Sequence, residues 1–184
     1  MASARGAPAG GFGPIRSGWS DAAAAAGLVA VLLIWLTALN RPLLCPCGAV
    51  RFWAPDHDSQ HLSDWYSLLH ISFGFGLALL VNHVQPAWPL PRKGLVVLAS
   101  SALWEGIENL PVVIARFNTP GAPGSYGGDT IVNALGDTIF VLGGFLLATR
   151  VRPGIVVVAA LLIEAAVWFA IRDGLLVGTL RLMA

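Results

Sequence analysis

Charged residues are scarce in this chain of 184 residues, making up 11% of it against about 25% in an average soluble domain. Hydrophobic residues make up 56%, and the mean hydropathy is +0.72. This balance excludes a solvated globular fold and predicts a membrane protein. Eleven basic side chains against ten acidic ones leave no strong surplus of positive charge, so we expect no nucleic-acid partner.

Cysteine is also rare, and the two cysteines stand at Cys45 and Cys47 with a single proline between them. Two cysteines cannot form a disulfide framework, and this spacing predicts that they are too close in sequence for an unstrained bridge to each other. A shared metal ion, an intermolecular partner and free thiols remain as alternatives.

The sequence does contain long apolar runs. A helix of about 20 apolar residues is enough to cross roughly 30 Å of hydrocarbon. Five such runs are found, over about 22–39, 62–82, 94–115, 129–149 and 154–172. Unpaired strand edges cannot lie in lipid, so the predicted fold class is all-α, a polytopic membrane bundle of about five transmembrane helices. Pro111 lies inside the third run and should kink that helix just past Glu108.

Residues 1–20 are rich in glycine and proline and lack a periodic apolar face, which predicts a flexible N-terminal tail before a single five-helix transmembrane domain over 21–184. Basic residues weakly favour one orientation. Six lie on the side of the N-terminus, and five lie on the other side: Arg5, Arg16, Arg92, Lys93, Arg150 and Arg152 against Arg41, Arg51, Arg116, Arg172 and Arg181. The positive-inside rule then places the N-terminus in the cytoplasm and the C-terminus outside.

Ionisable side chains inside the apolar runs indicate where function lies, because each one near the bilayer centre costs at least about 2.5–3.5 kcal/mol. A helical rise of about 1.5 Å per residue places His70, Glu108 and Asp137 roughly 10–12 Å below the same membrane face. Asp129, Asn133 and Asp137 follow one another at i, i+4 and i+8, which makes one polar stripe. Facing stripes of this kind build metal sites inside helix bundles.

Imidazole and carboxylate groups suit a divalent metal ion such as Zn, Mn or Fe. The side chains expected to take part fall into three roles: metal ligands His70, Glu108, Asp137 and Asp129; general acid or base Glu105 and Asp64; and substrate contacts Arg116, Arg172, Asn109 and Asn133. The two arginines would hold an anionic head group of a substrate from the outer leaflet.

Other interpretations of the same residues stay open. Protonated carboxylates hydrogen-bonded to neighbours such as Asn109 or Thr138 would tie helices together without any chemistry, and the two arginines would simply extend to the membrane interface. Two classes of function therefore remain. One is an enzyme acting on a lipid or another small amphiphilic substrate, and the other is a non-catalytic protein for binding, permeation or assembly of a membrane complex.

Two loops add candidate sites on the same side. The first carries enough soft and borderline ligands for a second metal site, at Cys45, Cys47, Asp56, His57, Asp58 and His61, or is an ordinary polar loop with two free thiols. The glycine-rich segment 121–128 leads to Asp129 at the start of a helix, where backbone N–H groups bind an anion or Asp129 is a plain N-cap.

Several motifs together resemble a small family of bacterial multi-pass membrane proteins of the UPF type. They are Cys45-Pro-Cys47-Gly48, Ser59-Gln60-His61 with Asp64-Trp65-Tyr66, His70, Trp104-Glu105 with Glu108-Asn109, and Gly128-Asp129-Thr130-Ile131-Val132-Asn133 with Asp137. The resemblance covers roughly residues 40–173 and implies an integral protein of the bacterial inner membrane with lipids around it, and no assigned activity. Members of the family usually have a second histidine where Phe73 stands and an asparagine where Gly174 stands. The layout of these polar groups also resembles that of VanZ-like membrane proteins.

Overall fold

The computed structural model describes residues 18–117 and 126–183, and the chain is all-helical over these two ranges. Seven helices follow one another within these ranges: α1 (Gly18–Ala38), α2 (Trp65–Val84), α3 (Leu90–Glu108), α4 (Pro111–Phe117), α5 (Ile131–Ala148), α6 (Pro153–Ile171) and α7 (Leu175–Met183). Four helices, α1, α2, α5 and α6, are long and apolar enough to cross a membrane, and the bent pair of α3 and α4 makes a fifth candidate if it counts as one span. The predicted all-α bundle is confirmed, with four to five candidate membrane spans.

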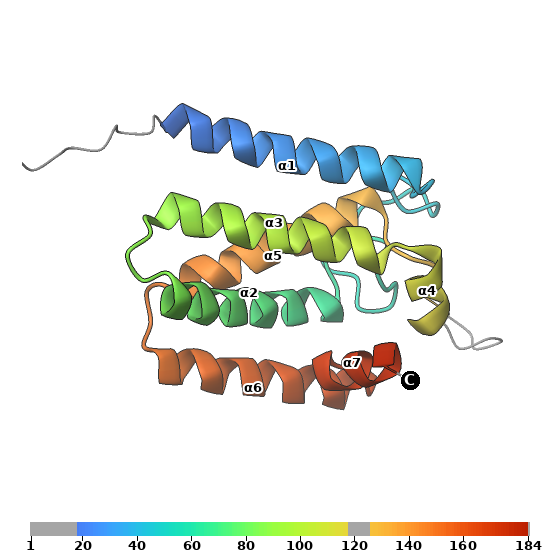
Figure 1. Ribbon diagram of the computed structural model, residues 1–184. Helices are drawn as coiled ribbons and strands as arrows, with labels where there is room; N and C mark the ends of the chain where they lie inside the picture. The colour runs from blue at the N-terminus through green and yellow to red at the C-terminus, as the bar shows by residue number, and fades with distance from the viewer. Residues whose placement is uncertain (1–17, 118–125, 184) are drawn as a thin grey trace, which may run out of the picture.

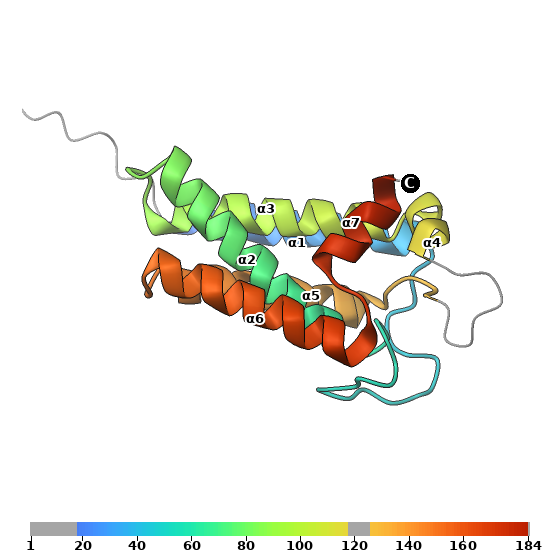
Figure 2. The ribbon, with the colours of Figure 1, turned by 90° about the horizontal axis from the view of Figure 1, so that it is seen from below.

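The five long helices lie side by side, and the chain segments between them gather at two opposite ends (Figure 1). One end holds the start of α1 and the turns that join α2 to α3 and α5 to α6. The other end holds the long loop over residues 39–64, the short helix α4 and the C-terminal helix α7, which crosses the bundle between α6 and α4 (Figure 2). The polar residues singled out in the sequence lie in and near this second end.

Helices α2 and α5 form the centre of the bundle, because two glycines let their backbones approach each other closely and a third lets the end of the long loop approach α5. A methyl group at any of these glycines would collide with a facing carbonyl: Gly74 with that of Val141, Gly144 with that of Ile71, and Gly136 with that of Leu62. Phe75 and Phe145 pack beside this contact in the apolar core. Helices α1 and α6 bury only 11% of their spans, so they present most of their apolar surface outward, where lipid would lie.

Local side-chain hydrogen bonds set where the two central helices begin. Asp64 caps α2 by accepting the Tyr66 N–H at 2.8 Å, while the Ser67 hydroxyl accepts the Asp64 N–H at 3.1 Å, which completes a capping box. Thr130 caps α5 by accepting the Asn133 N–H at 3.1 Å. The interpretation of Asp129 as the N-cap is therefore wrong.

The structure differs from the predicted spans in two further places. The break past Glu108 falls where Pro111 predicted a kink, but α3 ends there completely and α4 leaves at 76°. Pro111 is the first residue of α4, where its missing N–H is of no consequence. Helix α7 was not predicted at all. Most of the predicted N-terminal tail, and residues 121–125 of the glycine-rich segment, lie outside the described residues.

Candidate functional site

Three helical side chains converge between α2 and α3. His70, Glu105 and Glu108 each offer a ligand atom, and these atoms all lie within 4.8 Å of one another. His70 Nδ1 is 3.6 Å from Glu105 Oε1. We call these three residues the buried cluster, since His70 is 7% exposed and Glu105 is fully buried.

The carboxylate of Glu105 is the most unusual group in the cluster. Both of its oxygens are buried without a hydrogen-bond partner among the described residues, and the same holds for His70 Nδ1. Buried polar atoms are almost always paired in folded proteins, so unpaired atoms that face each other require an explanation. A cation bound between them supplies one, because carboxylate oxygen and imidazole nitrogen are ligands of Zn, Mn and Fe.

Asp137 on α5 approaches the other nitrogen of the same imidazole. Its Oδ2 lies 3.8 Å from His70 Nε2, and its Oδ1 accepts the Ser67 hydroxyl at 2.5 Å. A carboxylate in this position orients a histidine whose opposite nitrogen binds a metal. Asn133, one turn before Asp137, is also fully buried, and among the described residues neither its side-chain oxygen nor its nitrogen has a hydrogen-bond partner.

Asp129, one of the expected metal ligands, belongs to a separate network. Its carboxylate accepts the Asn109 amide at 2.5 Å and the Tyr126 hydroxyl at 2.9 Å, and its own N–H donates to Asn109 Oδ1 at 2.9 Å. The guanidinium of Arg41 donates to the Asp129 carbonyl at 2.8 Å. This network joins the end of α3 to the start of α5. Asp129 and Asn109 therefore stabilise the packing of these helix ends beside the buried cluster.

Asp64, expected as an acid or base, is also engaged with backbone. Besides the Tyr66 N–H, its carboxylate accepts the Ser59 N–H at 2.6 Å. The side chain is 1% exposed and fixes the end of the long loop against α2. It shares the end of the bundle with the buried cluster, but its carboxylate binds backbone N–H groups rather than side chains of the cluster.

A cavity of about 310 Å³ adjoins the buried cluster, with His70 and Glu108 in its lining. Its other walls combine apolar rings and chains with polar groups from the loop and the C-terminal segment: Leu69, Phe73, Trp104, Phe117 and Leu175, with Asp58, Tyr66, Tyr126 and Asp173. Partial burial at the rim raises the pKa of Asp58 above its ordinary value, although the nearby His57 opposes this. Polar side chains such as His70 and Glu108 beside amphipathic walls suit a ligand with a polar head and an apolar remainder.

Arg116 and Arg172, expected to hold an anionic head group, are exposed and are not among the residues that line this cavity. The guanidinium of Arg172 lies 4.6 Å from the centre of the Trp168 ring, which is a cation–π contact. An arginine on an aromatic ring at a helix end is typical of a side chain that extends to the membrane interface.

The C-terminal part of the cavity wall was not expected from the sequence. The Glu164 carboxylate accepts the N–H groups of Leu175 and Leu176 at 3.1 and 3.2 Å and so fixes the start of α7. Tyr66 donates its hydroxyl to Asp173 at 3.2 Å, which joins the same segment to α2. The sequence did contain a signal for this segment. Glu164 is an isolated carboxylate in an apolar run, and such a side chain needs a polar partner in lipid.

The structure corrects the expectation for the two cysteines, because Cys45 and Cys47 are joined by a disulfide. A turn closed by the Gly48 N–H on the Cys45 carbonyl, at 3.1 Å, folds the chain back on itself. The two Cα atoms thereby come to 5.2 Å from each other, within the range that disulfides span. The structure therefore shows a bridge in place of the shared metal ion, intermolecular partner or free thiols that the sequence left as alternatives.

The chain is similar to known bacterial proteins over most of its length. Residues 36–184 match the family described as "Protein of unknown function (DUF2585)". The chain is 34% identical over 173 residues to a UPF0314 protein of Sphingopyxis alaskensis, which covers 92% of this chain and 90% of the relative. It is 35% identical over 159 residues to a UPF0314 protein of Brucella anthropi, with 85% and 81% covered.

A third relative is the UPF0314 protein Atu8092 of Agrobacterium fabrum, 37% identical over 166 residues that cover 86% of this chain and 82% of the relative. No solved structure matches the chain. The likeness to VanZ-like proteins stays a prediction. The chain belongs to the bacterial UPF0314 family, and the family resemblance expected from its motifs is confirmed.

Proposed function

We propose that this protein is a metal-assisted hydrolase or transferase of the bacterial inner membrane, acting on the head group of a lipid or another amphiphile. The observation that carries the proposal is the unpaired carboxylate of Glu105, which faces His70 Nδ1 at 3.6 Å. Carboxylates that only tie helices together have hydrogen-bond donors around them, as Asp129 does. Glu105 has the surroundings of a metal ligand instead.

The three residues of the buried cluster take the role of ligands, and Asp137 orients the imidazole of His70. A divalent cation held there would polarise a substrate oxygen and lower the pKa of a bound water toward about 7. Asp58 lies in the cavity wall, and a carboxyl with a raised pKa suits proton donation to a leaving group. Phe73, Phe117 and Leu175 supply an apolar wall for an acyl chain.

The proposed orientation puts the N-terminus in the cytoplasm and the cavity end outside. Besides the small excess of basic residues on the N-terminal side, the Cys45–Cys47 disulfide supports this orientation, because disulfides persist in oxidising compartments. After reduction of intact cells, a membrane-impermeant maleimide should label the exposed Cys47. Labelling only after lysis would reverse the orientation.

Lipid profiles of a deletion strain test the proposed reaction. Complementation with the wild-type gene or with His83→Ala, a change of an exposed histidine at the opposite end, should restore the lipid species that the deletion alters. Glu108→Gln should not restore them, although the protein is present in the membrane at the normal level. Full restoration by Glu108→Gln would refute a chemical role for the cluster. An unchanged lipid profile in the deletion strain, with metal still bound by the purified protein, would favour the binding or permeation alternative.

A further inference from the structure

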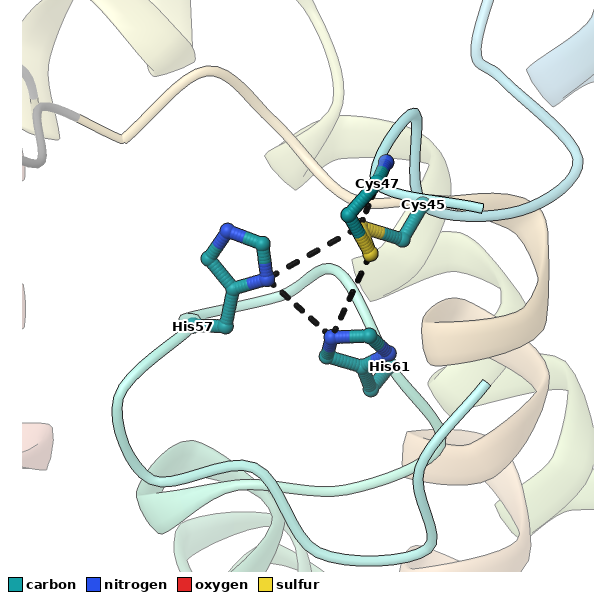
Figure 3. A group of neighbouring side chains, drawn as sticks. All are labelled: Cys45, Cys47, His57 and His61. Atoms are coloured by element: carbon teal, nitrogen blue, oxygen red, sulfur yellow. Dashed lines mark hydrogen bonds between the residues drawn. A yellow bond between two sulfur atoms is a disulfide. The ribbon is translucent and has the colours of Figure 1, made fainter. Parts of the chain in front are cut away.

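A second group of metal-ligating side chains lies in the long loop before α2, outside the site described above. Cys45, Cys47, His57 and His61 each offer a ligand atom, and these atoms all lie within 4.8 Å of one another. Figure 3 shows the two imidazoles and the two sulfur atoms pointing toward one common point. We call these four residues the loop cluster.

Three of the six distances between these atoms match the edges of a tetrahedral metal site or come close to them. His57 Nδ1 and His61 Nε2 are 3.1 Å apart, Cys45 Sγ is 3.7 Å from His57 Nδ1, and Cys47 Sγ is 3.9 Å from His61 Nε2. Metal–sulfur and metal–nitrogen bonds of about 2.3 and 2.0–2.1 Å give tetrahedral edges of roughly 3.3–3.8 Å. A further edge is the one between the sulfur atoms, which the disulfide shortens.

We propose that the loop cluster is a redox-dependent binding site for Zn²⁺ or a similarly soft metal ion. A dithiol reductant gives two electrons and two protons to the Cys45–Cys47 disulfide and becomes a disulfide itself. The ion then binds two thiolates and two neutral imidazoles, and the two thiol protons are released. Two thiolates balance the charge of a divalent ion, and a Cys₂His₂ set is a known zinc geometry.

The surroundings of the loop cluster allow an ion to enter and leave. Cys47 and His57 are exposed, and a surface hollow of about 300 Å³ is lined by both of them and by His61. Arg51 donates to His61 Nε2 at 3.4 Å, a long contact that an ion would replace. The same guanidinium also pairs with Asp56 at 3.0 Å, so it keeps a partner when the ion binds.

The loop cluster is joined to the wall of the cavity by the segment between its two histidines. Asp58 and Ser59 line the cavity. The Ser59 carbonyl accepts the Thr130 N–H at 2.9 Å, and Gln60 donates its amide to the Gly128 carbonyl at 3.1 Å. An ion held by His57 and His61 would therefore fix the segment that forms this part of the cavity wall.

Cobalt titration of the full-length protein in detergent tests the proposal, because Co²⁺ bound to thiolate has a sulfur-to-metal charge-transfer absorption. The buried cluster contains no sulfur and cannot give this band. Reduced wild-type protein should develop the band at about one Co²⁺ per chain, and protein kept oxidised should not. The double change Cys45→Ser with Cys47→Ser should abolish it, and Zn²⁺ should displace the cobalt.

Histidine variants separate a four-ligand site from a simple pair of thiols. His57→Ala, a change of an exposed side chain, should weaken Co²⁺ binding at least about tenfold and alter the tetrahedral d–d bands. His83→Ala and Glu105→Gln should leave the thiolate band unchanged. The proposal is overturned if the reduced wild type shows no band, or if His57→Ala and His61→Ala, folded by circular dichroism, both bind Co²⁺ with wild-type affinity and spectrum.

Discussion

The buried cluster and the loop cluster lie at the same end of the bundle, but different parts of the fold hold them (Figure 1). The buried cluster consists of an imidazole and two carboxylates on two packed helices, so its geometry depends on tertiary packing. The loop cluster consists of two thiols and two imidazoles within seventeen residues of chain, from Cys45 to His61. Oxygen ligands favour harder ions and thiolates favour softer ones. The two clusters should therefore prefer different metal ions, and different substitutions should abolish metal binding at each.

The largest expected effect comes from Gly74→Ala, which tests the dependence of the buried cluster on helix packing. The added methyl group meets the Val141 carbonyl, so α2 and α5 must separate, and overpacking of this kind typically costs about 1–3 kcal/mol and occasionally more. The melting temperature in detergent should fall by many degrees, and the buried cluster should lose its metal. Gly143→Ala on α5, where nothing lies within 4 Å of the new methyl group, is the control and should melt close to the wild type.

Asp137→Asn should have the next largest effect and should act on one cluster alone. The loss of charge beside His70 Nε2 weakens the orientation of the imidazole, so metal affinity of the buried cluster should fall by about 10–100-fold. Isothermal titration with Mn²⁺ measures this change, and the cobalt–thiolate band of the loop cluster should stay as in the wild type. An equal loss at both clusters would mean that the change disturbs the whole end of the bundle.

Asp64→Ala should lower stability without removing a ligand. The variant leaves the Tyr66 and Ser59 N–H groups without their acceptor, and the loss of an N-cap costs about 0.5–2 kcal/mol. Denaturant titration should show this loss, with Asp64→Asn closer to the wild type because its amide oxygen still accepts. A large drop in metal affinity in a folded Asp64→Ala protein would mean that this carboxylate takes part in metal binding at the buried cluster.

Arg172→Gln should have the smallest effect of all. The side chain packs on Trp168 at the surface and does not line the cavity, so stability should change by no more than about 0.5 kcal/mol. Restoration of the lipid profile should remain within about twofold of the wild type. A strong loss of function in the folded variant would support the original expectation that this arginine holds an anionic head group.

The sequence was sufficient to predict the helical spans and the end of the bundle where polar residues gather, because both follow from apolar run length and helical rise. It also predicted that His70 and Glu108 would lie near each other. It did not show that Asp129 accepts hydrogen bonds from its neighbours whereas Glu105 has no donor among the described residues. This difference depends on how three helices pack against one another. Helix α7 was missed because the residue that fixes it, Glu164, lies eleven positions before Leu175 and is brought to it only by a reversal of the chain.

The most direct test of the account is the metal content of purified protein in which Cys45→Ser and Cys47→Ser have removed the loop cluster. Mass spectrometry of this protein, folded in detergent and dialysed against a mixture of Zn²⁺ and Mn²⁺, should find about one metal ion per chain. Adding Glu105→Gln should reduce the value to near zero, whereas adding Asp129→Asn should leave it near one in the folded protein. Equal metal content with and without Glu105→Gln would contradict the assignment of the buried cluster as a metal centre.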